Sequence, residues 1–178
     1  MAMNFNPMDN QDGILMYCAQ SEEGLGDFVA LVVKDERVEF RYDIGSGLAI
    51  IRSNHVLQPG VWTHVSVNRD FKEGNLTING EPTIGGKSPG TARTMTLNTL
   101  LYIGGVDRRR ITVNRNAGVS RTFRGCISDV SSYELIQRLS IGLFKLKNIV
   151  CHVLLARSVF NECGYTEVSL GFSKHRRL

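Results

Sequence analysis

The stretch Arg37-Val38-Glu39-Phe40-Arg41-Tyr42 alternates charged and apolar residues without a break. Successive side chains of a β-strand point to opposite faces, so the apolar residues share one face and Arg37, Glu39 and Arg41 share the other. The pattern therefore predicts a strand that is buried on one face and exposed to water on the other.

Strand patterns also lie on both sides of this stretch. An apolar, β-branched run at 28–33 precedes it, and Lys34-Asp35-Glu36 is short enough to be a tight turn between the two strands. Residues 61–67 alternate again, with the valines and Thr63 on the predicted inner side. We expect Trp62, in the same stretch, to pack in or beside the core rather than to form a platform for a sugar.

Asn79-Gly80 separates two short strand patterns at 76–78 and 82–84, and this dipeptide is the strongest short-range signal of a β-hairpin. Two further strands are predicted at 100–103 and 126–130. No extended helical stripe of apolar residues occurs before residue 130, whereas beyond it leucines at near-helical spacing leave helix and strand both open. Many short strands joined by turns predict an all-β, antiparallel sandwich.

Length and charge limit the classes of protein that the chain can belong to. Its 178 residues, 42% of them hydrophobic, suit one domain with a sizeable core. No apolar run approaches the ~20 residues of a membrane-spanning helix, so membrane insertion is not expected. Residues 1–10 show no signal peptide, which leaves an intracellular chain or a piece of a longer protein. The net charge is +4, with an acidic stretch at 1–51 and a basic remainder that can attract polyanions.

An ordered series of motifs runs along residues 5–130. It comprises Asp12-Gly13-Ile14-Leu15-Met16-Tyr17, Gly26-Asp27-Phe28-Val29-Ala30-Leu31, Phe40-Arg41-Tyr42-Asp43, Pro59-Gly60-Val61-Trp62, Leu101-Tyr102-Ile103-Gly104-Gly105 and Phe123-Arg124-Gly125-Cys126. Taken in order, these motifs resemble a laminin G-like domain of the perlecan, agrin and pikachurin type. The resemblance implies a jelly-roll β-sandwich of the laminin G-like and concanavalin-like class.

The resemblance also sets the expected boundaries. Residues 1–130 are expected to form the sandwich core, from which the first edge strand of the family is missing. Residues 131–163 are expected to be an atypical C-terminal part of the same domain, and residues 164–178 a basic tail. We expect the chain to be a fragment of a larger, multidomain protein.

The four cysteines include no C-x-x-C pair, so a zinc site is not expected. The residues alone leave open which cysteines pair, or whether all four are reduced thiols in the core. The resemblance implies a closing disulfide between Cys126 and Cys151, with Cys163 as the alternative partner of Cys126.

The resemblance further implies a weak Ca²⁺ site at one rim of the sandwich, and Ca²⁺ prefers oxygen ligands. The positions that match the family supply two side chains, those of Asp27 and Asn98, and two backbone carbonyls, those of Ile44 and Thr96. In the alternative interpretation Asp27 only ends a glycine-rich turn and Asn98 only caps another.

Arg108-Arg109-Arg110 follows a Gly-Gly turn, and Arg115 lies shortly downstream. Guanidinium groups pair with sulfate or carboxylate through two hydrogen bonds, so these four residues are candidates for binding an acidic or sulfated glycan beside the calcium rim. The alternative is a solvated loop that keeps the protein soluble. Because no aromatic residues are interleaved and no nucleic-acid module is visible, nucleic acid is not an expected partner.

No catalytic motif is present. A glycosidase on this kind of scaffold needs paired carboxylates, and no Glu-x-Asp-x-Glu stretch occurs, so we expect a binding module and not an enzyme. Asn75-Leu76-Thr77 fits an N-glycosylation sequon, which we place at a turn where a glycan can be accommodated. Chance occurrence of the three residues is the alternative.

The resemblance implies a secreted module of the extracellular matrix, and the basic residues make an anionic ligand plausible. We expect it to use Ca²⁺ to bind acidic or heparin-like glycans, or a cell-surface receptor such as dystroglycan. The alternative is a structural or adhesive domain that contacts protein through a sandwich edge and binds neither metal nor glycan. A Ca²⁺-dependent rise in melting temperature separates the two, because a ligand that binds only the folded state stabilises it.

Overall fold

The computed structural model describes residues 1–131 and 153–155. Within that part of the chain the strands are, in order, β1 (Ala2–Pro7), β2 (Gly13–Ala19), β3 (Phe28–Lys34), β4 (Arg37–Asp43), β5 (Leu48–Arg52), β6 (Thr63–Asp70), β7 (Glu73–Ile78), β8 (Ile84–Lys87), β9 (Leu101–Ile103), β10 (Gly125–Ser131) and β11 (Val153–Leu155). A short 3₁₀ helix, η1 (Arg115–Ala117), lies between β9 and β10.

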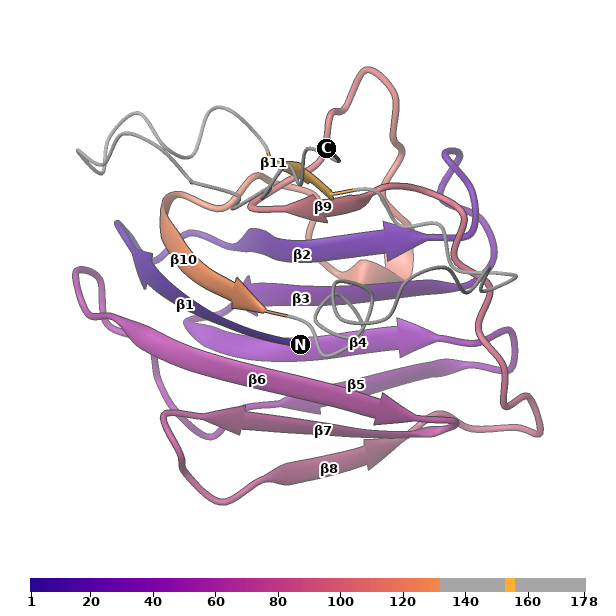
Figure 1. Cartoon of the computed structure of the whole chain (residues 1–178), viewed down its shortest axis with the longest axis horizontal. Helices are drawn as coiled ribbons and strands as arrows, with labels where there is room; N and C mark the ends of the chain where they lie inside the picture. Colours follow the sequence, from indigo (N-terminus) through magenta and orange to yellow (C-terminus); the bar gives the residue numbers. More distant parts are fainter. Residues whose placement is uncertain (132–152, 156–178) are drawn as a thin grey trace, which may run out of the picture.

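The strands form two sheets that face each other (Figure 1). The five-stranded sheet has the order β10-β1-β6-β7-β8, and the six-stranded sheet has the order β11-β9-β2-β3-β4-β5. The pairs of named strands are antiparallel except β11 with β9, which is parallel. The predicted all-β sandwich is therefore confirmed.

Local turn chemistry explains the predicted strand connections. Asp35 and Glu36 both have positive φ, 47° and 59°, and join β3 to β4 as the tight turn expected there. Asn79 and Gly80 have φ of 48° and 75° and form a tight turn after β7, in which the Glu81 N–H donates to the Ile78 carbonyl oxygen over 2.8 Å. The whole connection from β7 to β8 is longer and spans 79–83. The predicted hairpin is confirmed, although β8 begins only at Ile84.

β1 and β5 are among the strands that the sequence pattern did not predict. β1 lies between β6 and β10, inside the five-stranded sheet, yet only Met3 and Phe5 mark it as a strand among asparagines and a proline. β5 follows the turn at 44–47 directly and has only five residues. In both cases the apolar pattern is too short to be distinguished from a loop before the neighbouring strands are known.

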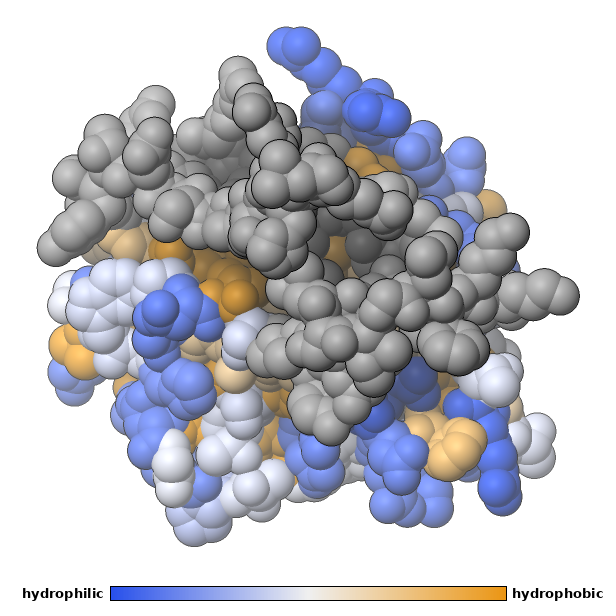
Figure 2. Space-filling view, in the orientation of Figure 1, coloured by the Kyte–Doolittle hydropathy of each residue, from blue (hydrophilic) through white to orange (hydrophobic). Residues whose placement is uncertain are grey.

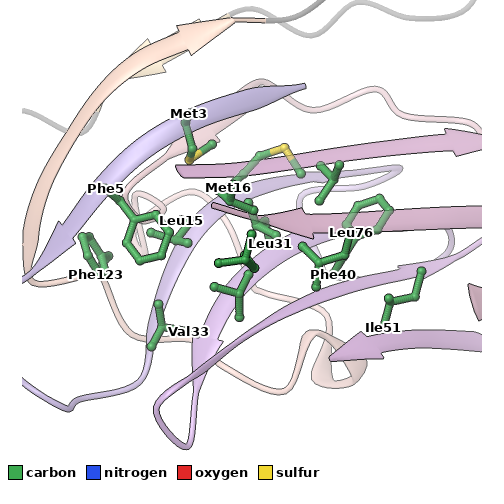
Figure 3. Close-up of a cluster of buried hydrophobic side chains, with 14 of the residues drawn as sticks. Met3, Phe5, Leu15, Met16, Leu31, Val33, Phe40, Ile51, Leu76 and Phe123 are labelled. Atoms are coloured by element: carbon green, nitrogen blue, oxygen red, sulfur yellow. The ribbon is translucent and has the colours of Figure 1, made fainter. Parts of the chain in front are cut away.

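The core lies between the two sheets, where side chains from both meet (Figure 3). It contains the buried residues Met3, Phe5, Leu15, Met16, Leu31, Val33, Phe40, Ile51, Leu76 and Phe123, among others. Phe5 and Phe123 pack edge to face with ring centroids 5.8 Å apart, which joins β1 to the segment before β10. This layer matches the apolar face predicted for each alternating strand.

The outer face of the six-stranded sheet is also covered, which contradicts the prediction for β4. A second buried cluster packs residues of β2, β3 and β9 against the segment 106–119, with Ala30 and Ala117 fully buried. On the same face Glu39 is only 2% exposed and Arg41 only 8% exposed. The predicted exposed face of β4 is therefore wrong. A segment that lies 75 residues further along the chain covers this face, and Arg41 Nη1 donates a hydrogen bond to its Asn116 carbonyl oxygen.

The start of the alternating stretch 61–67 also differs from the prediction. β6 begins at Thr63, and Val61 and Trp62 are 48% and 50% exposed. They belong to a turn in which the Val61 N–H donates to the Gln58 carbonyl oxygen over 3.2 Å. The strand alternation does not extend into this turn, so Trp62 is half-buried beside the sandwich rather than in its core.

The predicted C-terminal part at 131–163 and the basic tail at 164–178 lie almost wholly outside the described residues, so these boundaries stay predictions, as does the missing first edge strand. Among the residues that the structure describes, no helix is long and apolar enough to cross a membrane.

Candidate functional site

The four predicted ligand residues belong to segments that meet at the end of the six-stranded sheet where β3 begins and β4 ends. Figure 1 shows this end of the two strands at the right. β3 begins directly after Asp27, β4 ends directly before Ile44, and these two strand ends pair with each other. The segment before β9 reaches the same end, because the Asn98 N–H donates to the Ala19 carbonyl oxygen over 2.9 Å and Ala19 is the last residue of β2. We call the end formed by Asp27, Ile44, Thr96 and Asn98 the rim site.

The Asp27 carboxylate lies between the two segments that carry the predicted carbonyl ligands. Its Oδ2 accepts a hydrogen bond of 2.8 Å from the Thr96 N–H. Its Oδ1 faces Gly45, where an added Cβ would lie 3.4 Å from that oxygen. The carboxylate thus bonds to Thr96 itself and lies next to the residue that follows Ile44.

Asp43 shapes the loop beside this carboxylate. Its Oδ1 accepts hydrogen bonds from the N–H groups of Gly45, at 2.9 Å, and Gly47, at 3.1 Å. Aspartate commonly stabilises a turn in this way. Ile44 is only 2% exposed and packs into the core.

The donor set at the rim site suits a hard cation. In the described part of the chain no three His, Cys, Asp or Glu side chains lie close enough together to hold a metal ion. A metal site there must therefore use backbone and amide oxygens as well. One carboxylate, one amide and two carbonyl groups form such a set, and Ca²⁺ accepts ligands of these kinds.

A groove of about 660 Å³ borders the rim site. It is lined by three segments, 23–26, 112–116 and the loop residues Asp43, Gly45 and Gly47. Gly26 immediately precedes Asp27, and Asp43 and Gly45 flank Ile44, so the groove and the rim site share an edge. We call it the rim groove, and the sequence alone did not reveal it.

The segment 112–116 forms one wall of the rim groove, and hydrogen bonds to distant residues hold it in place. The Thr112 N–H donates to the Glu22 carbonyl oxygen over 2.8 Å, and the Asn114 N–H donates to the Tyr17 hydroxyl oxygen over 2.9 Å. Within the wall, the Asn116 N–H donates to Asn114 Oδ1 over 2.9 Å. Burial raises the pKa of Tyr17, so its hydroxyl stays protonated and neutral at physiological pH.

The four arginines predicted to bind a glycan lie in two different segments. Arg115 lines the rim groove, beside the rim site. Arg108, Arg109 and Arg110 belong to a separate turn, in which the Arg109 N–H donates to Asp107 Oδ1 over 3.0 Å. Arg108 Nη2 donates to the Ser120 carbonyl oxygen over 2.8 Å. Figure 2 shows hydrophilic side chains projecting at the top of the molecule, where Figure 1 places this loop.

Asn75 lies in the middle of β7, where it pairs with Asn68 of β6 and Gly85 of β8, and its side chain is exposed on the outer face of the five-stranded sheet. The predicted placement at a turn is therefore wrong, because the sequon overlaps the strand that the hairpin prediction began only at residue 76. Use of the sequon stays a prediction.

Two of the four cysteines, Cys18 and Cys126, lie in the described part of the chain. Cys126 lies on β10, and Cys151 and Cys163 lie outside the described residues, so the predicted Cys126–Cys151 disulfide stays a prediction. Cys18 is 1% exposed on β2, and its thiol donates to the Thr99 carbonyl oxygen over 3.6 Å.

Comparison with known proteins decides the family. Residues 9–134 match the family model of the laminin G domain. The chain belongs to this family. The laminin G domain is 36% identical over 129 residues to the basement membrane-specific heparan sulfate proteoglycan core protein of mouse, which covers 72% of this chain and 3% of that protein. It is 36% identical over 121 residues to human pikachurin, covering 68% of this chain and 12% of that protein.

Solved structures agree on the fold. Domains LG4-5 of the mouse laminin α1 chain align with a TM-score of 0.60 at 22% identity, over 71% of this chain and 32% of that chain. The predicted resemblance is thus confirmed, and with it an extracellular matrix module of a non-catalytic family. The laminin G domain spans only a small part of its curated relatives, 3% of the proteoglycan and 12% of pikachurin.

Proposed function

We propose that this laminin G domain binds acidic glycans with the help of a Ca²⁺ ion at the rim site. The observation that supports the proposal most directly is the position of the Asp27 carboxylate, which contacts the Thr96 N–H through Oδ2 and faces Gly45 through Oδ1. The carboxylate is hydrogen-bonded to Thr96 and lies next to the loop that begins at Ile44. The backbone of Asn98 is held at the end of β2, where its N–H donates to the Ala19 carbonyl oxygen.

The proposed cation leaves positions for a ligand. Ca²⁺ takes roughly 6–8 oxygen ligands, so the four protein oxygens leave places for water or for the carboxylate oxygens of a sugar. The charge of the ion then attracts the acidic sugar, and the few protein ligands keep the metal affinity weak. Such a site suits the extracellular space, where Ca²⁺ is abundant.

Arg115 supplies a second contact in this proposal. Arg115 lines the rim groove and is exposed, which supports pairing of its guanidinium group with a sulfate or carboxylate next to the metal-bound sugar. Heparin-like glycans and the acidic glycans of a receptor such as dystroglycan carry groups of this kind. Arg108, Arg109 and Arg110 add positive charge at longer range, which salt screens.

Arg115→Glu is expected to remove the calcium-dependent part of heparin binding. The wild-type domain should elute from a heparin column at higher salt in Ca²⁺ than in EDTA, and the variant should elute at the same salt in both. The matched control is Arg109→Glu with Arg110→Glu, which changes more charge but lies in the separate turn. The control should lower elution equally with and without Ca²⁺. If the wild-type domain elutes identically in Ca²⁺ and EDTA, the proposed function is wrong.

The alternative function, protein contact without metal or glycan, draws support from a different part of the structure. Val61 and Trp62 are adjacent and about half exposed, at 48% and 50%. Their turn lies next to the end of β1, because the Gly60 N–H donates to the Pro7 carbonyl oxygen over 2.8 Å. Loss of partner binding in Trp62→Ser, with glycan binding intact, would favour this alternative.

A further inference from the structure

A buried ion pair lies beneath the rim groove on the outer face of β4. Arg41 Nε and Nη2 both lie 2.6 Å from Glu39 Oε2, and the two residues are 8% and 2% exposed. Arg52 Nη1 lies 2.7 Å from the other oxygen, Glu39 Oε1, from the more exposed edge strand β5. Glu39 therefore uses both oxygens to hold arginines, and it fixes the orientation of the Arg41 guanidinium.

Arg41 also reaches the wall of the rim groove. Its Nη1 donates a hydrogen bond of 3.1 Å to the Asn116 carbonyl oxygen. Gly118, which ends η1 with φ of 76°, leaves the space that the guanidinium occupies, since an added Cβ would collide with it. The C-terminal end of the segment 112–116 is thus hydrogen-bonded to the buried Arg41. Contacts within β4 and with β5 fix the position of Arg41 in turn.

Stability alone does not explain this arrangement. Taking a carboxylate and a guanidinium out of water is costly, and well-packed apolar residues of similar size often serve stability as well or better. What the ion pair adds is a directed hydrogen bond to one backbone carbonyl at the edge of the groove. The buried arginine therefore acts on the wall more specifically than an apolar side chain would.

We propose that Arg41 is the positioning residue of the rim groove. Arg41 fixes the distance between the segment 112–116 and the rim site. At that distance Arg115 can pair with the acidic group of a bound glycan. The inference takes its ligand, an acidic glycan, from the proposed function. The position of the segment 112–116 does not depend on that function. In the described structure the hydrogen bonds and ion pairs of Arg41 go to Glu39 and Asn116 and not to the predicted Ca²⁺ ligands, so its loss should weaken glycan binding and leave metal binding unchanged.

The first test measures the wall itself by hydrogen–deuterium exchange in the full chain. In Arg41→Met, the amides of 112–118 should exchange faster than in the wild-type protein, and the amides of β3 should exchange as before. Arg41→Lys, which keeps a positive charge beside Glu39, should restore part of the protection. Unchanged exchange at 112–118 in Arg41→Met overturns the inference, whether or not the wild-type domain binds glycan.

The second test measures the ligand and the metal separately. Arg41→Met should bind heparin oligosaccharide in Ca²⁺ about tenfold more weakly, the loss expected for one hydrogen bond from a charged group. Its Ca²⁺-induced rise in melting temperature should equal that of the wild-type protein. Leu76→Ala, a core truncation in the other sheet, is the control for lowered stability and should keep the wild-type heparin affinity. Equal heparin affinity of Arg41→Met and the wild-type protein overturns the inference, whereas no binding by the wild-type protein overturns the proposed function.

Discussion

Asp27→Ala should abolish the rise in melting temperature that Ca²⁺ gives the wild-type domain. Asp27 is the one carboxylate of the rim site, and its removal leaves an amide and two carbonyls, too weak a set for a divalent cation in water. With a dissociation constant of ~10⁻⁴–10⁻³ M, typical of extracellular sites, 10 mM Ca²⁺ should stabilise the wild-type protein by about 1.4–2.7 kcal/mol. This corresponds to an increase of roughly 3–10 °C, measured by thermal unfolding.

The control for this prediction is Asp12→Ala, at the opposite end of the same sheet. The Asp12 carboxylate accepts a hydrogen bond from the Asp35 N–H over 2.9 Å, so its loss should lower stability slightly and leave the Ca²⁺ effect unchanged. Asn98→Ala should retain a reduced effect, since the amide is a weaker ligand than the carboxylate. A full Ca²⁺-induced increase in Asp27→Ala would place the metal elsewhere and contradict the rim site.

Glu39→Ala should destabilise the domain by about 3–5 kcal/mol, because it leaves Arg41 buried without its counter-charge. Glu39 is 2% exposed and holds two arginines, one through each oxygen. The comparison is Glu73→Ala, whose carboxylate lies 3.8 Å from Lys87 Nζ on a side chain that is 71% exposed. Removing that exposed pair should cost about 0–1 kcal/mol.

Urea unfolding followed by tryptophan fluorescence measures both variants, since Trp62 is the single tryptophan and its half-exposed ring reports on the turn before β6. Glu39→Gln, which keeps the shape and a hydrogen-bond acceptor, should be intermediate and remains measurable if the alanine variant does not fold. Equal losses of unfolding free energy in Glu39→Ala and Glu73→Ala would show that the ion pair beneath the groove is not shielded from water.

Local pattern was enough to predict most of the sandwich. The strands at β3, β4, β9 and β10 and the two tight turns follow from alternation and turn residues, which act within a few positions of the chain. The exposed face predicted for β4 was wrong at Glu39 and Arg41, because their burial depends on the segment 106–119. A sequence pattern within one strand contains no information about a covering segment that arrives from elsewhere.

Some residues of the candidate site could likewise be identified from the sequence, and others could not. Asp27, Ile44, Thr96 and Asn98 were identified through the family resemblance, since one aspartate after a glycine-rich turn has no special composition. Composition also singled out the run Arg108-Arg109-Arg110, yet the groove is bordered by Arg115. The wall residues Asn114 and Asn116, and Arg41 behind them, gave no signal in the sequence, because their role depends on contacts between distant segments. Only the positive φ and small size required at Gly118 hint at the close approach of another group.

The most direct test is a crystal structure of the domain grown in 10 mM Ca²⁺, with anomalous difference density collected to locate the ion. We predict one peak, coordinated by an Asp27 carboxylate oxygen, the Asn98 amide oxygen and the carbonyl oxygens of Ile44 and Thr96. A well-ordered rim with no peak, or a peak coordinated by other residues, would contradict the account.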